Sequence, residues 1–314
     1  MRRLVPGSLM LLASLLVGAR ALAGDPQPGD PRAIEIARQT LAAIERGWAL
    51  GRYDQAGRVR AAINLRGAGG TAPAVTANIV VDRRARQWRA DAAGDIGPLT
   101  LYADAERATL YVPALKQHAS RRAGGLAPGA SVARNLTSEI ALMRSRLDGG
   151  YEPLVLRGEE SLGGATTWRL DDTPAPGVTA SYWIDQTTSL PRRIALDRPG
   201  RRDVRLDFQY GSSPRPTRVD AYLQGQQDVQ ITISPRYDAT GRATRLHLVS
   251  RVAGGGEFAT DVTLDWAPRV AAGFFRFDPP AGAQAVSFTQ LSQGVLFSAA
   301  GKLSALLPLF LGAR

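Results

Sequence analysis

The stretch that decides the fold is Arg58-Val59-Arg60-Ala61-Ala62-Ile63-Asn64-Leu65-Arg66. Apolar residues at 59, 61, 63 and 65 alternate with polar residues at 58, 60, 64 and 66. A period of two places successive side chains on opposite faces of a β-strand, so the stretch predicts a strand with one buried and one solvated face. Residues 75–81 repeat the pattern after a glycine-rich turn.

Similar segments recur along most of the chain, and Gly, Pro, Asp and Asn separate them, as antiparallel hairpins require. Further strands are predicted at 87–92, 99–103, 109–112, 154–158, 166–170, 179–184, 193–197, 204–210, 217–223, 228–234, 244–251 and 257–266. Strands do not alternate with helices, which argues against a parallel sheet. The expected fold class is mainly β with a few helices, in which a large curved antiparallel sheet forms an incomplete β-barrel closed by helices.

Three segments have helical periodicity instead. Asp30 is a suitable N-cap with Pro31 at the first helical position, and an apolar stripe from Ile34 to Trp48 follows, with Gly51 as the expected stop. A second stripe runs through residues 132–147 and ends at a glycine pair. The third, residues 291–311, is almost entirely apolar, with Lys302 as its one charge.

The N-terminus has the three zones of a secretory signal peptide. Arg2 and Arg3 precede an uncharged apolar run, and Ala21-Leu22-Ala23 offers the small residues that a signal peptidase reads. We expect cleavage after Ala23. The domain prediction is then a signal peptide at 1–23, a tether at 24–29, a half-barrel domain at 30–287 with extra strands near 200–256, and an apolar C-terminal helix at 288–314.

Composition narrows the compartment and the partners. The chain has no cysteine, which excludes both a lipoprotein and a disulfide-stapled secreted module. Export of such a chain is typical of a periplasmic protein. The formal charge of +11 comes mostly from arginines, which alternate along strands rather than cluster. We interpret them as a solvated face, with no nucleic-acid partner and with lipid headgroups as a minor option.

Catalytic chemistry is hard to find in this sequence. His118 and His247 are the two histidines, and no metalloprotease, P-loop, nucleophile-elbow or dinucleotide motif is present. Neighbouring carboxylates at Glu159-Glu160 and Asp171-Asp172 are interpreted as loop residues, since adjacent strand positions face opposite ways. The prediction is a binding protein rather than an enzyme, with no catalytic residues, no cofactor and no metal site. A hydrolase with a dispersed site stays as a minor alternative.

The remaining signal lies in four segments in chain order, residues 80–89, 103–117, 182–194 and 275–282. Together they resemble the LolA/LolB-like family of periplasmic lipoprotein carriers. Residues 80–89 are similar to the family's strand, basic turn and aromatic-bearing strand, and residues 103–117 to its aspartate-turn hairpin. Residues 182–194 are similar to its aromatic-Ile-Asp and Leu-Pro hairpin, and residues 275–282 to its closing strand and turn. The resemblance implies an open barrel with a hydrophobic interior that takes acyl chains. This chain is longer than the carriers, and it lacks the proline that follows the family's basic turn.

The leading hypothesis is a periplasmic lipid- or lipoprotein-binding carrier. The candidate cavity residues are aromatic or branched and lie at predicted inward positions: Trp88, Leu99, Leu101, Leu110, Val112, Trp168, Trp183 and Phe208. The resemblance implies a functional basic residue at Arg83 or Arg84. The alternative is an envelope-stress sensor or regulatory module that uses the same fold to bind an envelope protein partner.

The apolar tail leaves three readings open. It docks on the barrel mouth and occludes it, it makes transient membrane contact through residues 291–311, or it spans a membrane. The run after Lys302 is short for a span, which needs roughly 20 apolar residues. Docking is favoured.

Overall fold

The structure is a computed structural model that describes residues 29–48, 56–67, 75–94, 97–122, 143–149, 154–175, 177–197, 203–224, 228–253 and 256–291. The predicted signal peptide, most of the tether, most of the helix predicted at 132–147 and the tail beyond residue 291 lie outside these residues. The chain divides into two compact units. Unit 1 comprises Met1–Met10, Gln55–Asn135 and Thr260–Arg314, and unit 2 comprises Leu11–Asp54 and Leu136–Ala259.

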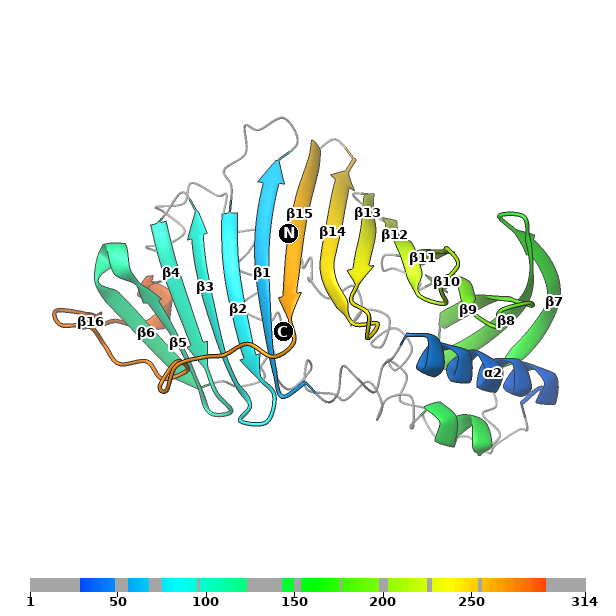
Figure 1. Cartoon of the computed structure of the whole chain (residues 1–314), viewed down its shortest axis with the longest axis horizontal. Coiled ribbons are helices and arrows are strands. Elements are labelled where there is room, and N and C mark those ends of the chain that lie inside the picture. The colour runs from blue at the N-terminus through cyan, green and yellow to red at the C-terminus, as the bar shows by residue number, and fades with distance from the viewer. Residues whose placement is uncertain are drawn as a thin grey trace. The chain divides into compact units, whose positions relative to one another are not determined.

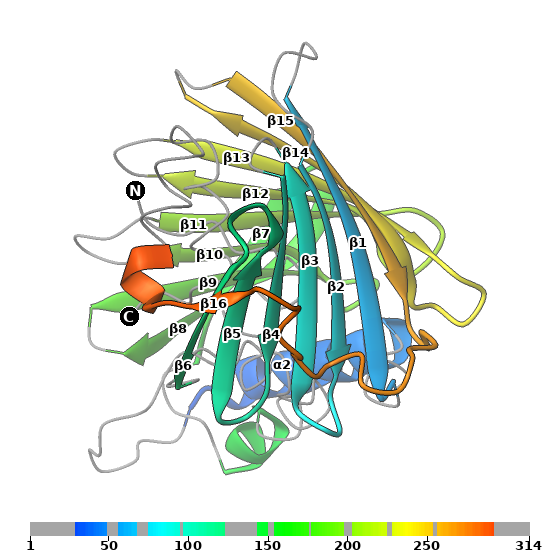
Figure 2. The same cartoon turned by 90° about the vertical axis from the view of Figure 1, so that its left-hand side faces the viewer.

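Unit 1 is built on an open sheet (Figures 1 and 2). Its strands are β1 (Arg58–Gly67), β2 (Val75–Asp82), β3 (Gln87–Gly94), β4 (Gly97–Ala103), β5 (Arg107–Val112), β6 (Gln117–Arg122), β15 (Gly256–Asp265, which begins in unit 2) and β16 (Gln284–Ala285). Their order in the sheet is β16-β6-β5-β4-β3-β2-β1-β15. Neighbours from β1 to β6 are antiparallel hairpins, whereas β16 pairs with β6 in parallel.

The register of unit 1 explains where its core lies. Ile79 is paired with Ala90, Ala90 with Leu101, Leu101 with Leu110, and Leu110 with Ala119. Residues paired across strands share a face, so the alternation of each strand adds up to one apolar face across the sheet. We call this the apolar face of unit 1 and its reverse the polar face.

Unit 2 has the same construction. Its strands are β7 (Val155–Leu162), β8 (Ala165–Ala175), β9 (Val178–Asp185), β10 (Pro191–Asp197), β11 (Asp203–Tyr210), β12 (Pro216–Gln224), β13 (Val229–Tyr237) and β14 (Ala243–Val252). They follow one another in chain order across the sheet, each antiparallel to the next. The expected fold class, mainly β with one large, curved, open antiparallel sheet and few helices, is therefore confirmed.

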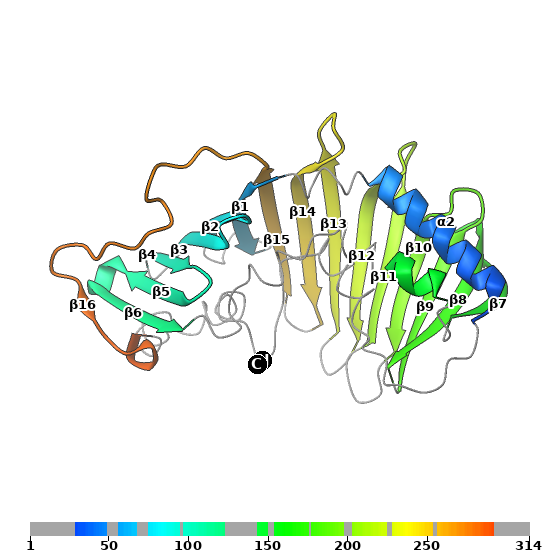
Figure 3. The same ribbon diagram turned by 90° about the horizontal axis from the view of Figure 1, so that it is seen from below.

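Helix α2 (Pro31–Gly47) crosses the strands of unit 2 on one face (Figure 3). The Asp30 carboxylate accepts hydrogen bonds from the backbone N–H groups of Arg32 at 2.9 Å and Ala33 at 3.3 Å, and its other oxygen accepts from Leu156 N–H of β7 at 3.3 Å. At the far end, the Trp48 indole lies 6.2 Å from the Phe208 ring of β11. A helix of this length spans about 25 Å, enough to cross five strands.

Residues 143–148 form a short helical segment that packs Leu147 against the same core as α2. Within the described part of the chain, no helix combines the length and the apolarity that crossing a membrane requires.

The predicted strands are confirmed with ends shifted by a few residues, and the Asp30 cap is confirmed as well. The helix ends at Gly47 rather than at Gly51, because Trp48 caps it and donates its indole N–H to the Pro214 carbonyl at 3.0 Å. Two strands, β6 and β16, were not expected. The interpretation of the paired acids as loop residues is wrong, since Glu159 and Glu160 lie in β7 and Asp171 and Asp172 in β8.

The Asp30 contacts predict a measurable loss of stability on substitution. Asp30→Ala removes the helix cap and the acceptor for β7 together, so the free energy of unfolding should fall by about 1–2 kcal/mol. Asp30→Asn keeps an acceptor oxygen and should retain most of the stability. Urea unfolding followed by circular dichroism measures both, and an Asp30→Ala variant as stable as the parent would contradict the assignment.

Candidate functional site

The apolar face of unit 1 brings together five of the eight predicted cavity residues. Trp88 of β3, Leu99 and Leu101 of β4, and Leu110 and Val112 of β5 all belong to one buried cluster. Each is between 3% and 9% exposed. The period of two in three successive strands puts them there, because positions 88, 99, 101, 110 and 112 share the face in this register.

Small residues make this face shallow in its middle. The same cluster contains five alanines that stand between the large side chains: Ala90, Ala92, Ala103, Ala108 and Ala119. In the row that starts at Trp88, the next two paired positions are Ala103 and Ala108. The larger side chains therefore border a shallow area over Ala103 of β4 and Ala108 of β5, which we call the alanine floor.

The chain's own C-terminal segment, residues 284–291, covers part of this floor; we call it the cover segment. It begins as β16, where Gln284 N–H donates to Lys116 O at 2.8 Å and Val286 N–H to His118 O at 2.9 Å. Phe288 and Val286 then pack on the buried cluster, and Leu291 is fully buried within it. The predicted docking of the tail beyond residue 291 lies outside the described residues, but the segment leading into it packs on this face.

One cation faces the cover segment. The Arg121 guanidinium of β6 lies 4.5 Å from the centroid of the Phe288 ring. Burial lowers the pKa of Arg121 from its ordinary value, because a charge loses water there. The sequence interpretation did not select this residue, since β6 contains a single apolar residue, Ala119, and was not predicted as a strand.

The polar face of unit 1 is tied by aromatic rings and ion pairs. Arg89 forms a two-pronged ion pair with Asp91, with the Nη2 to Oδ1 distance at 2.9 Å, and its guanidinium lies over both Tyr102 and Phe274. The Phe277 ring packs beside Tyr102, at 5.3 Å between centroids. Phe274 and Phe277 belong to the segment that leads from β15 to β16, so this segment is anchored across the strands (Figure 2).

A groove of about 380 Å³ opens beside this segment, lined by Arg58, Gln87 and residues 270–276. Arg58 donates to Asp82 at 2.7 Å. Burial alone would raise the pKa of Asp82, but the backbone N–H of Ala85 and the Arg58 guanidinium outweigh it, so the pKa is lowered. The charge that Arg58 contributes to the groove lining is therefore paired with Asp82.

The predicted basic residues Arg83 and Arg84 occupy the turn between β2 and β3. Arg83 donates its backbone N–H to Gly57 O at 2.8 Å, and the Arg84 side chain lies against Gly57. Both are therefore at the end of the hairpin, and the apolar face carries Arg121 instead.

In unit 2, Trp168 and Phe208 lie on the face that α2 covers. Trp168 packs against the core formed with α2, and the Arg32 guanidinium stacks 4.5 Å from its ring centroid. Phe208 is 3% exposed beneath Trp48 at the helix end. The structure thus divides the predicted set between two units rather than gathering it in one cavity.

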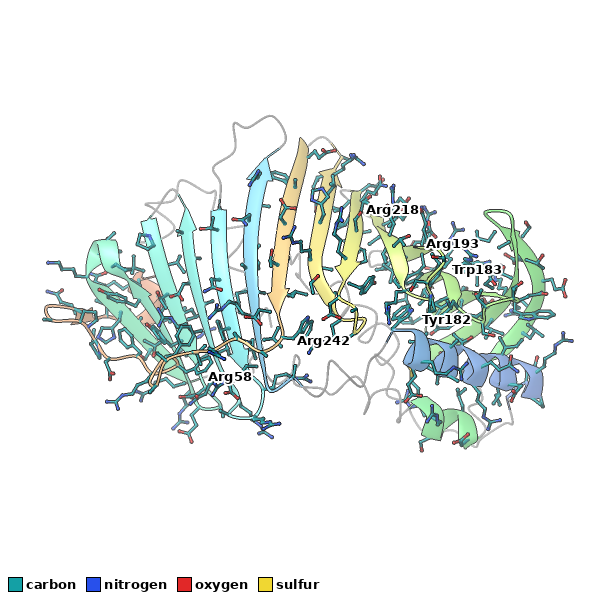
Figure 4. All side chains as sticks on the ribbon, in the orientation of Figure 1. Arg58, Tyr182, Trp183, Arg193, Arg218 and Arg242 are labelled. Carbon is teal, nitrogen blue, oxygen red and sulfur yellow. The ribbon has the colours of Figure 1, made fainter. Side chains whose placement is uncertain are left out.

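Trp183 is on the opposite face of β9 from the core, which corrects its predicted inward orientation. Tyr182 and Ile184 occupy the core side, and Trp183 is paired with Arg169 and Arg193 on the other. Its indole N–H donates to Glu160 at 2.6 Å, and both guanidinium groups lie within 6 Å of its rings (Figure 4). Adjacent residues of a strand point to opposite faces, so the inward orientation of Ile184 places the neighbouring Trp183 outward.

The carboxylates of unit 2 serve as partners for arginine. Asp171 accepts from Ser181 at 2.8 Å, from Arg157 at 2.9 Å and from Arg169 at 3.1 Å. Burial alone would raise the pKa of Asp171, but these hydrogen bonds outweigh it and lower the pKa. Among the described residues, no group of three or more His, Asp or Glu is placed to hold a metal ion.

No protein-family model and no curated protein matches the chain. Among solved structures, it is similar to a LolA superfamily protein from Nitrosomonas europaea, at 12% identity and a TM-score of 0.30, over 73% of this chain and 96% of that one. It is similar to a putative outer membrane lipoprotein-sorting protein domain from Vibrio parahaemolyticus, at 14% identity and 0.29, over 79% and 97%. It is also similar to the Pseudomonas aeruginosa MucA/MucB complex structure, at 13% identity and 0.18, over 76% and 100%. These scores are low, so no residue role follows from them.

The Asp171 contacts predict acid sensitivity. Because the folded-state pKa lies below the ordinary value of 3.8, the contribution of Asp171 to stability is full above that value and is lost as the pH falls through the folded pKa. Asp171→Asn should therefore be less stable at neutral pH and should lose less stability on acidification than the parent. Urea midpoints at neutral pH and at steps below pH 4 measure this, with Asp197→Asn at an exposed strand end as control. Parallel curves for parent and Asp171→Asn would contradict it.

Proposed function

We propose that this protein binds the acyl chains of a lipid or of a lipidated protein on the apolar face of unit 1. The observation that carries the proposal is the buried apolar cluster of β3–β6 with its alanine floor and its cover segment. Each methylene transferred from water to such a surface contributes about 0.8 kcal/mol, so about ten methylenes offset the cost of immobilising a lipid.

The cover segment supports this proposal because it is attached weakly. Its only described backbone pairing with another strand is the two-residue parallel strand β16, and three side chains, Val286, Phe288 and Leu291, supply its described contact with the apolar cluster. An acyl chain can replace those contacts with its own. By contrast, α2 in unit 2 is fixed at both ends, by Asp30 on β7 and by Trp48 at Pro214.

The protein then acts as a carrier or binding protein, and we propose no catalysis for it. The proposed setting is the periplasm, in line with the predicted cleavage after Ala23, where a water-filled space separates lipid donors from acceptors.

Substitutions on the two faces of unit 1 test the proposal. Phe288→Ala loosens the cover and should make a fluorescent fatty acid bind about tenfold tighter, because the lipid no longer competes with that ring. Phe277→Ala, which removes a ring from the polar face in the segment that leads from β15 to β16, should leave binding unchanged. Fluorescence titration measures the affinity, and native mass spectrometry of detergent-free protein shows co-purified lipid. Absence of binding in both the parent and Phe288→Ala would overturn the proposal.

The second candidate is a regulatory module that binds an envelope protein. A specific feature favours it: among the described residues β8 is the only strand that pairs with β7, and no strand covers the other edge of β7 beyond Leu156, whose N–H donates to Asp30. Val155 at its start is 38% exposed. An open edge with an exposed apolar side chain can add a strand from a partner.

This candidate predicts that charge on the β7 edge weakens capture of a partner. Val155→Lys should reduce recovery of an envelope protein in a pull-down, because a lysine on an edge strand opposes further pairing. Leu115→Lys, at another exposed apolar position in unit 1, is the control and should recover as much as the parent. Equal recovery with all three proteins would exclude the β7 edge as the binding surface.

A further inference from the structure

Arg121 occupies a position on the apolar face where its neighbours are uncharged. In the register, Arg121 is paired with Ala108, which is paired with Ala103, which is paired with Trp88. Among the apolar-face positions of β1–β6 as described, Arg121 is the one ionised side chain, and Gln117 the other polar one. An arginine stays charged in a protein, so this face carries a fixed cation.

Among the described residues, the guanidinium of Arg121 has no ion pair and no hydrogen-bond acceptor, and its Nε is buried without a partner. Two arginines on the polar face of unit 1, by contrast, are held by carboxylates, Arg58 by Asp82 and Arg89 by Asp91. The Phe288 ring faces Arg121 but offers no acceptor to the N–H groups at the edge of the guanidinium plane.

A second unpartnered donor lies in the same row. Trp88 is 4% exposed, and its indole N–H has no acceptor in the structure. Three strand spacings separate Trp88 from Arg121, about 14 Å across the sheet, with two alanines between them. A buried N–H without an acceptor is costly, so two such donors on one apolar face indicate a ligand that carries oxygen atoms.

The cover segment has the chemistry of a substitute for such a ligand. It places an aromatic ring on the Arg121 cation and an aliphatic side chain, Leu291, in the apolar cluster. A ring satisfies a cation less well than an anion does, because a charged acceptor forms short, strong hydrogen bonds with guanidinium. A ligand with an anionic head and an apolar chain therefore matches both parts of the site better than the segment does.

We propose that the apolar face of unit 1 selects lipids with an anionic headgroup, whose phosphate or carboxylate pairs with Arg121 while the chain lies over the alanine floor. The inference rests on the proposed function and adds the class of lipid. Burial of the cation supports it, because a partly desolvated charge gains more from an anion than a fully solvated one.

The test compares a fluorescent fatty acid, ionised at the pH used, with its uncharged methyl ester. The parent protein should bind the acid about tenfold or more tightly than the ester, as a charge-assisted hydrogen bond implies. Arg121→Gln should abolish this preference, so that acid and ester bind with equal affinity, and Arg121→Lys should keep part of it. Arg122→Gln removes the same charge from the adjacent, exposed position of β6 and should behave like the parent.

The outcomes separate the two proposals. Tight binding of both probes by the parent, with Arg121→Gln unchanged, overturns the headgroup inference and leaves acyl binding intact. Absence of binding of either probe overturns the proposed function itself. Excess inorganic phosphate should not displace the ester, because a free anion cannot occupy the floor. Displacement of the ester by phosphate would identify a site for free anions and overturn the inference.

Discussion

The constraint on which both units depend is the opposition of neighbouring side chains along a strand. The register of each hairpin pairs apolar residues of one strand with apolar residues of the next. Ile79, Leu101 and Leu110 therefore lie on the same face of unit 1. A slip of one residue in the β2–β3 hairpin would place Arg89 beside Ile79 on the apolar face. The turns at β2–β3 and β9–β10 resist such a slip, since Asp82 and Asp185 each bind backbone N–H groups within the turn.

The reverse faces show how an arginine-rich chain can cover a wide sheet. In unit 2, Arg169, Trp183, Arg193, Asp207 and Asp220 are paired in succession from β8 to β12. Single exposed ion pairs contribute little, typically below about 1 kcal/mol. The aromatic ring and the aliphatic parts of the arginine side chains also make apolar contacts. This row of side chains therefore covers the backbone of the sheet while its charged groups stay in contact with water.

The sequence was sufficient for most strands and for the Asp30 cap, because both depend on local patterns. It was insufficient where a residue's role depends on strands far away in the chain. β6 has one apolar residue, so its sequence does not indicate a strand. Only the pairing of Arg121 with Ala108, and its contact with Phe288 over 160 residues further on, place Arg121 on the apolar face. Asp171 was interpreted as a loop residue because adjacent strand positions face opposite ways, whereas it lies in β8 and its partners, Arg157 and Ser181, lie on two other strands. The predicted inward orientation of Trp183 was wrong for a different reason. The alternation of side chains along its own strand is enough to place Trp183 on the outward face.

The route of the C-terminal segment links two properties of unit 1. The chain crosses the polar face through Phe274 and Phe277, reaches the outer edge of β6 as β16, and turns onto the apolar face at Phe288. β16 therefore also shields the last strand from joining a strand of another molecule. On the proposed function, a lipid that displaced the segment would also withdraw this shield, so lipid binding and self-association would be coupled. The lipid-bound form would then be the form with the exposed strand edge.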